Sequence, residues 1–173
     1  LSATPIPRSM NLSLAKLKDL SIISTPPSNR ISVKTFVHSY NENLIKEAIQ
    51  RELLRGGQIY YLCNDLKVIE DRKQRLEENF PKQKVEIIHG QLKSRDIEER
   101  MINFLENKTQ ILVCSTIIES GIDISNANTL IVEDADMLGL AQLHQLRGRV
   151  GRGKKQAFAY FLRSKQIKNK SKS

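Results

Sequence analysis

Residues 58–88 read QIYYLCNDLKVIEDRKQRLEENFPKQKVEII, and their alternation sets the class of fold that we expect. The segment opens with the apolar run Gln58-Ile-Tyr-Tyr-Leu-Cys63 and closes with the shorter run Val85-Glu-Ile-Ile88. Between the two runs lies a charged segment of helical length. A helix between two short apolar runs is typical of a βαβ unit, whose strands are buried in a parallel sheet. The segment therefore predicts an α/β protein.

The same alternation continues along most of the chain. Strands that alternate with helices of this length predict a three-layer fold, with helices on both faces of one parallel sheet. The expected strands are 32–38, 58–63, 84–88, 110–114, 129–133 and 156–162, and the expected helices are 42–54 (ended by Gly56-Gly57), 66–80, 94–107 and about 139–152.

A break in this pattern predicts a domain boundary near the start of the chain. The segment Thr25-Pro-Pro-Ser-Asn-Arg30 carries two prolines, which exclude helical geometry. We expect residues 1–30 to be the end of one domain and a linker, 31–162 to be the main domain, and 163–173 to be a basic, disordered tail. Because the chain begins with Leu1, we expect it to be a piece of a longer polypeptide.

Charge and composition favour an anionic partner inside the cell. The chain of 173 residues has a net charge of +9, and part of this excess comes from the basic tail. Such a balance suits nucleic acid. Cys63 and Cys114 each end an apolar run and are interpreted as small core residues, and no Cys/His group has metal-ligand spacing. We expect a soluble intracellular protein, or a piece of one, without a membrane segment.

The segment Gln145-Leu-Arg-Gly-Arg-Val-Gly-Arg152 is unusual for a helix because it combines arginines with two glycines. At 100° per residue from Leu140, Leu143, Leu146 and Val150 form an apolar stripe at about 240–300°. Gln145, Arg149 and Arg152 lie opposite at about 120–180°, whereas Arg147 flanks the stripe at about 340°. Gly148 and Gly151 would each cost such a helix roughly 1 kcal/mol relative to Ala, so we expect a close backbone approach or a helix break. A basic, solvated helix end is the alternative.

These residues carry a resemblance. Gln145, Gly148, Arg149, Gly151 and Arg152 resemble motif VI of superfamily two helicases and translocases, which implies a RecA-like domain. The resemblance implies that Arg149 and Arg152, with Gln145, act catalytically as arginine fingers toward ATP, and that Gly148 approaches the nucleotide. Arginine fingers stabilise the charge that develops on a transferred phosphoryl group.

Short polar residues follow several of the expected strands. Ligands of open parallel sheets bind outside the carboxyl ends of the strands. Asn64 follows the strand 58–63, His89 and Gly90 follow 84–88, and Ser115-Thr116 follows 110–114. Such loops hold a nucleic-acid backbone without reading bases, but turn chemistry and helix capping explain the same residue types. The segment containing His89 and Gly90 resembles the His-Gly-Gln segment of these motors, which implies a contact with DNA phosphate.

Two further segments extend the resemblance. Thr116-Ile-Ile-Glu-Ser-Gly-Ile-Asp-Ile124 resembles motif V, which implies that Thr116 contacts the DNA backbone while Gly121 and Asp123 approach the nucleotide. A turn before the next strand would explain the Gly and the Asp, but not the Thr. The segment Ser2-Ala3-Thr4 resembles motif III, which couples the ATP site to the DNA track.

The resemblance covers almost all of residues 1–162 and is nearest to the transcription-repair coupling factor family, with RecG-like helicases as the alternative. It implies part of an ATP-dependent translocase on double-stranded DNA in the bacterial cytoplasm or in an organelle. Such a translocase displaces stalled RNA polymerase and recruits excision-repair proteins through regions outside this chain. The 173 residues contain no Gly-x-x-x-x-Gly-Lys-Ser/Thr, so we expect ATP and Mg²⁺ to be bound mainly by another domain, and this chain alone to be inactive. A non-enzymatic nucleic-acid-binding module is a second class of function.

Overall fold

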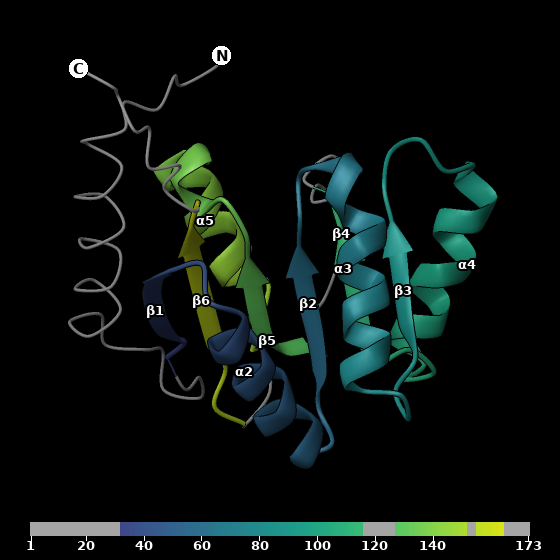
Figure 1. Cartoon of the computed structure of the whole chain (residues 1–173), viewed down its shortest axis with the longest axis horizontal. Helices are drawn as coiled ribbons and strands as arrows, with labels where there is room; N and C mark the ends of the chain where they lie inside the picture. Colours follow the sequence, from purple (N-terminus) through teal and green to yellow (C-terminus); the bar gives the residue numbers. More distant parts are fainter. Residues whose placement is uncertain (1–31, 116–126, 152–154, 165–173) are drawn as a thin grey trace, which may run out of the picture.

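A computed structural model describes residues 32–115, 127–151 and 155–164. Strands and helices alternate through these residues, as the apolar runs predict (Figure 1). The strands are β1 (Lys34–Ser39), β2 (Gln58–Leu62), β3 (Val85–Ile88), β4 (Ile111–Cys114), β5 (Ala127–Val132) and β6 (Phe158–Arg163), and the helices are α2 (Glu42–Leu54), α3 (Leu66–Asn79), α4 (Ser94–Leu105), the short 3-10 helix η2 (Ala135–Met137) and α5 (Leu140–Gly148).

The six strands form one sheet in the order β1-β6-β5-β2-β4-β3. All five pairs of neighbouring strands run parallel. Every carboxyl end therefore lies at one edge of the sheet, called here the carboxyl edge, and every strand begins at the opposite amino edge. The residues that directly follow β2, β4 and β3 consequently lie side by side at the carboxyl edge.

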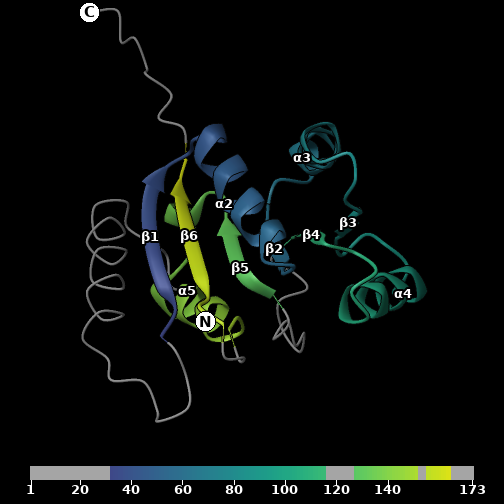
Figure 2. The same cartoon turned by 90° about the horizontal axis from the view of Figure 1, so that it is seen from below.

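Helices cover both faces of this sheet, so the predicted three-layer α/β fold is confirmed. Figure 2 shows α2 and α3 on one face and α4 and α5 on the other. The two hydrophobic cores follow the same division. One core packs Ile49 and Ile69 of α2 and α3 against the sheet, and the other packs Phe104 and Leu143 of α4 and α5. Alternate side chains of β2 serve the two cores, since Tyr61 points into the first and Tyr60 into the second.

Local sequence signals explain where α2 and α3 begin and end. The Asn41 side chain accepts hydrogen bonds from the backbone N–H groups of Asn43 and Leu44, at 2.9 and 3.2 Å, and thereby caps α2. Asp65 caps α3 through the N–H of Lys67 at 2.9 Å. At the end of α2, Gly56 has a φ of 75° and donates its N–H to Leu53, as expected from the glycine pair.

One expected boundary is wrong. The apolar stripe suggested a helix over about 139–152, but α5 ends at Gly148. Gly151 has a φ of 75°, which a continuing right-handed helix cannot contain. The other bounds agree with expectation to within about two residues. The predicted linker and tail, with residues 1–31 and 165–173, lie outside the described residues, so the predicted domain division remains a prediction.

Both cysteines belong to the core, as expected. Cys63 and Cys114 are each about 2% exposed or less, and they lie in the cores on opposite faces of the sheet. Burial raises the pKa of each thiol to about 12. Cys63 directly follows Leu62, which pairs with Cys114 across the neighbouring strands β2 and β4. The two cysteine side chains lie on opposite faces of the sheet, so a disulfide between them is excluded.

Candidate functional site

The C-terminal end of α5 lies near the amino edge of the sheet. Gly151 donates its N–H to the carbonyl of Ala127, the first residue of β5, at 3.3 Å. We call Gln145, Gly148 and Arg149 the arginine edge. These residues form the last part of α5 and its cap, next to the amino edge of the sheet. Leu143 and Leu146 of the same helix are buried at 0% and 1% exposure, whereas Gln145 and Gly148 are exposed and Arg149 is half-buried. Within α5, the predicted division into an apolar and a polar side is confirmed.

The two glycines of this segment have different structural reasons. A Cβ atom on Gly151 would collide with the Cβ of Ala157, and its positive φ also favours glycine. The predicted close approach and helix break therefore both occur at Gly151. Around Gly148, by contrast, a Cβ atom would meet nothing within 4 Å. Packing among the described residues does not require a glycine at position 148.

The helix on which the predicted angle of Arg152 depends is shorter than expected. That angle assumed that α5 continues to residue 152, whereas the helix ends four residues earlier and is followed by the left-handed Gly151. Arg152 itself lies outside the described residues. The angle calculated for Arg149 remains applicable, because this cap residue keeps right-handed helical angles, with φ −88° and ψ −14°.

Arg147 lies beside the apolar stripe, as its angle predicts. It is half-buried, and this burial lowers the pKa of its guanidinium. One guanidinium nitrogen of Arg147 lies 3.4 Å from Nδ1 of His144. The sequence did not predict this pair. Burial, followed by the charge of Arg147, lowers the pKa of His144. Arg147 thus contacts a side chain of its own helix and is not counted with the arginine edge.

The carboxyl edge gathers the predicted phosphate contacts. Asn64 lies after β2, Ser115 after β4, and His89 with Gly90 after β3, and these three strands are neighbours in the order β2-β4-β3. Strands lie about 4.8 Å apart, so Asn64 and His89 follow strands separated by roughly 10 Å. Asn64 and Gly90 are exposed, and His89 is half-buried. The sequence correctly placed these residues at one edge.

Local hydrogen bonds account for part of this arrangement. Nδ1 of His89 accepts the backbone N–H of Gln91 at 3.2 Å, and its carbonyl accepts that of Leu92 at 3.2 Å. His89 therefore stabilises the turn before α4. Asp65 rather than Asn64 caps α3 through its side chain, so helix capping does not explain Asn64.

The remaining predicted site residues lie outside the described residues. They are Thr116, Gly121 and Asp123 of the motif V segment, Arg152, and Ser2, Ala3 and Thr4. The described residues that flank the motif V segment are Ser115 at the carboxyl edge and Ala127 at the amino edge. The carboxyl and amino edges are separated by the length of a strand, roughly 16 Å for five residues. The arginine edge and the predicted phosphate contacts therefore lie at opposite edges.

A buried ionic network near the carboxyl edge was not predicted. Glu133 follows β5 and is 5% exposed. Arg72 of α3 donates to both of its carboxylate oxygens, with Nε to Oε2 at 2.9 Å and Nη2 to Oε1 at 3.0 Å. The Tyr61 hydroxyl donates to the same carboxylate at 2.7 Å. Burial lowers the pKa of Arg72, but the hydrogen bonds and charge of Glu133 outweigh this effect and raise it. The network ties α3 to the ends of β2 and β5.

Neither a metal site nor a membrane span is found in the part of the chain that the structure describes. No three His, Cys, Asp or Glu side chains gather there in a way that suits a metal ion. None of the described helices combines the length and apolar character needed to cross a membrane.

Comparisons with known proteins agree with this architecture. The model of the family described as "Helicase conserved C-terminal domain" matches residues 40–154. A transcription-repair-coupling factor from Escherichia coli strain K12 is 54% identical over 162 residues, which are 94% of this chain and 14% of that protein. The structure of RecG bound to a three-way DNA junction matches with a TM-score of 0.70 and 36% identity, over 95% of this chain and 22% of that one. The C-terminal domain of the DEAD-box protein Dbp5 shares the fold, with a TM-score of 0.59, 19% identity and 78% of each chain covered.

Proposed function

Because the chain belongs to the helicase conserved C-terminal domain family, we propose that it is the second RecA-like domain of an ATP-dependent translocase on double-stranded DNA that couples transcription to repair. The family assignment and the RecA-like fold confirm the resemblance inferred from the motifs. The identity to transcription-repair-coupling factors is the observation that carries the finer proposal. Since the chain spans only a small part of such proteins, the displacement of RNA polymerase and the recruitment of excision-repair proteins would depend on regions outside it.

Geometry at the arginine edge supports a role toward a nucleotide. Gly148 is exposed and has open space at the position of a Cβ, so a ligand or a neighbouring domain has room to approach its backbone. Arg149 follows immediately and Gln145 lies one turn before it, and α5 buries its leucines away from both. In the proposal, Arg149 and Arg152 stabilise negative charge on ATP held by another domain, assisted by Gln145, Gly148, Gly121 and Asp123. Hydrolysis of ATP, which binds together with Mg²⁺, drives the movement along DNA.

Geometry at the carboxyl edge supports contacts with the DNA backbone. Asn64 and Gly90 expose short polar groups after strands that belong to the same half of the sheet. Contacts of this kind position a protein on nucleic acid but carry little sequence information. We assign Asn64, His89, Gly90 and Thr116 to the DNA track, and Ser2, Ala3 and Thr4 to the coupling between the track and the ATP site.

A RecG-like helicase remains the second candidate. The match to RecG over nearly the whole chain supports it, and that structure contains a DNA junction. Both candidates use duplex DNA, so they share the proposed roles of the two edges. They differ in the protein partner, since only the first acts on RNA polymerase. Displacement of a stalled polymerase by the full-length protein would distinguish them.

Replacing Arg149 in the full-length protein tests the role of the arginine edge. We expect Arg149→Ala to lower DNA-stimulated ATP turnover by roughly 10³-fold, the range for an arginine finger, while DNA affinity changes little. Arg147→Ala is the matched control, because this arginine lies on the same helix but contacts His144. It should lower turnover far less. Equal losses in the two variants, with thermal unfolding showing both to be folded, would refute the assignment.

A further inference from the structure

The C-terminal end of α2 carries a buried carboxylate that the proposed function does not use. Glu52 is 1% exposed, and α2 is followed directly by β2, so this end of the helix lies at the amino edge of the sheet. Arg55 donates to the carboxylate of Glu52, with Nε to Oε2 at 2.7 Å and Nη2 to Oε1 at 2.8 Å. The hydroxyl of Thr129 in β5 donates to Oε1 at 2.9 Å. Gly57 leaves room for the carboxylate, because a Cβ atom there would lie 2.7 Å from it. The buried charge is therefore paired, and it ties α2 to β5.

Arg55 extends this tie to the segment that precedes β6. Its Nη1 donates to the carbonyl of Gln156 at 2.9 Å, and its guanidinium lies over the ring of Phe158, 5.1 Å from the centroid. Lys155 donates in turn to the carbonyl of Arg55 at 3.3 Å. The planar guanidinium thus bonds Glu52 with one side and the backbone of Gln156 with another. The ammonium group of a lysine lacks this fork geometry.

The contacts of the Glu52–Arg55 pair end on both sides of the turn after α5. Gly151 donates its N–H to Ala127 at 3.3 Å, and its missing Cβ makes room for the Cβ of Ala157. Ala127 begins the strand that Glu52 contacts, and Ala157 directly follows the carbonyl that Arg55 holds. Both neighbours of Gly151 therefore belong to backbone segments that this pair fixes.

We propose that Glu52 and Arg55 are positioning residues for the arginine edge, because they fix the turn that follows Arg149. The inference rests on the proposed function, in which Arg149 and Arg152 stabilise charge on ATP. These two arginines flank the turn in the sequence, so a shift of the turn would displace their guanidinium groups. A misplacement of about 1 Å can lower a reaction rate about 10²-fold. Since Glu52 is buried, it acts through the turn and not on the nucleotide.

Amide hydrogen exchange of the ¹⁵N-labelled chain, followed by NMR, tests the positioning directly. Arg55→Lys keeps a cation beside Glu52, so it avoids the unpaired buried charge that Arg55→Ala would leave. We expect the Gly151 amide to exchange about tenfold faster in Arg55→Lys, because the segments on both sides of it are held less firmly. The amide of Glu133, which is hydrogen-bonded at the carboxyl edge, should change by less than about twofold.

Turnover of the full-length protein tests the consequence. Arg55→Lys should lower kcat for ATP hydrolysis at saturating DNA by about 10-fold to 100-fold, with KM for ATP within about threefold, because a displaced guanidinium loses interactions made in the transition state. Arg51→Lys is the matched control. Arg51 lies one turn earlier on α2 and over the same ring of Phe158, 5.9 Å from the centroid, but it is exposed. This variant should change neither kcat nor the exchange of Gly151 by more than about twofold.

Unchanged exchange of Gly151 in Arg55→Lys, or equal acceleration at Glu133, would overturn the positioning role. Equal losses of kcat in Arg55→Lys and Arg51→Lys would also overturn it. A normal kcat in Arg55→Lys, beside the roughly 10³-fold loss expected for Arg149→Ala, would overturn this inference and leave the proposed function standing. If Arg149→Ala itself kept normal turnover, the proposed function would fail, and the inference that rests on it would fail with it.

Discussion

Gly148 and Gly151 lie three residues apart, but the structure gives them opposite sensitivities to substitution. Gly151 has a positive φ, and its missing Cβ makes room for Ala157. Gly148 is the last residue of α5, has helical geometry and has open space beside it. Stability therefore requires glycine at position 151 and would tolerate alanine at position 148. If Gly148 is retained for a nucleotide, stability and activity should respond in opposite directions.

We expect Gly148→Ala to leave the domain as stable as before, or to stabilise it by up to about 1 kcal/mol, because alanine favours helix. The same variant in the full-length protein should reduce ATP turnover, since its methyl group would occupy the space proposed for the nucleotide. Gly151→Ala should destabilise the domain by about 1–3 kcal/mol through backbone strain and overpacking. Urea unfolding of the two variants checks stability, and a Gly148→Ala protein with unchanged turnover would contradict the nucleotide role.

At the scale of elements, the sequence predicted the regular parts well because the strands are buried on both faces. Runs such as Ile111-Leu-Val-Cys114 are continuously apolar, and every side chain of β4 is buried. The glycine pair after α2 also marked its end correctly. The end of α5 was missed because Val150 keeps the helical spacing of the apolar stripe although it lies beyond the helix, buried at 3% exposure. Periodicity alone does not distinguish a helix from a turn that buries a residue at the same spacing.

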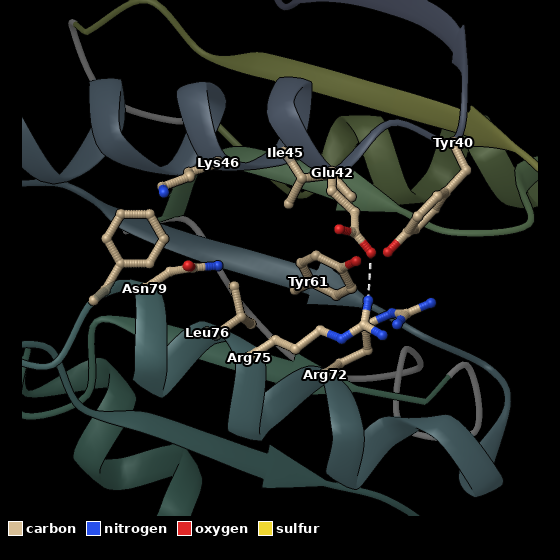
Figure 3. Close-up of a pocket in the computed structure, with 10 residues that line it drawn as sticks. Tyr40, Glu42, Ile45, Lys46, Tyr61, Arg72, Arg75, Leu76 and Asn79 are labelled. Carbon is tan, nitrogen blue, oxygen red and sulfur yellow. Dashed lines mark hydrogen bonds and ion pairs between the residues drawn. The ribbon is translucent and has the colours of Figure 1, made fainter.

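The tie between α3 and β5 was beyond local sequence reasoning for a different reason. A charged Glu133 directly after the apolar strand β5 is a visible signal of a buried polar group. Its partner could not be identified, because α3 carries several cationic side chains and only the packing of α3 against the sheet selects Arg72. The same limit applies to the small pocket between α2 and α3 (Figure 3), which depends on the spacing of two helices. Long-range pairings of this kind require the three-dimensional arrangement.

Removing Arg72 tests how strongly this tie holds the two elements. Arg72→Met should destabilise the domain by about 3–5 kcal/mol, because it leaves the buried carboxylate of Glu133 without its cation. Adding Glu133→Gln should recover part of this loss, since a neutral amide still accepts the hydrogen bond from Tyr61 and needs no counter-charge. Urea unfolding of the single and double variants measures both effects. A double variant no more stable than Arg72→Met would show that packing, not charge, dominates this contact.

For the whole molecule, the proposed nucleotide site and the proposed DNA site lie at opposite edges of the sheet. The arginine edge faces away from the carboxyl edge, where Asn64, His89 and Gly90 gather. A nucleotide and a DNA backbone would therefore reach the domain at different places. Under the proposed roles, another domain would close over the nucleotide while DNA stays bound at the carboxyl edge. ATP turnover and DNA binding would then respond to different substitutions. The isolated chain can test this for DNA binding.

The isolated chain should bind duplex DNA weakly, without sequence preference and with strong dependence on salt. If cationic side chains of this basic chain neutralise about three phosphates, the affinity should fall roughly 40-fold between 50 and 200 mM salt. Asn64→Ala should weaken this binding, whereas Arg149→Ala at the opposite edge should not change it. Fluorescence anisotropy with two duplexes of unrelated sequence measures these effects on DNA binding. The isolated chain should also show no DNA-stimulated ATP hydrolysis, because we expect the phosphate cradle to belong to another domain. A marked preference for one duplex that survives at high salt would indicate base readout and contradict a translocase that must pass over any sequence.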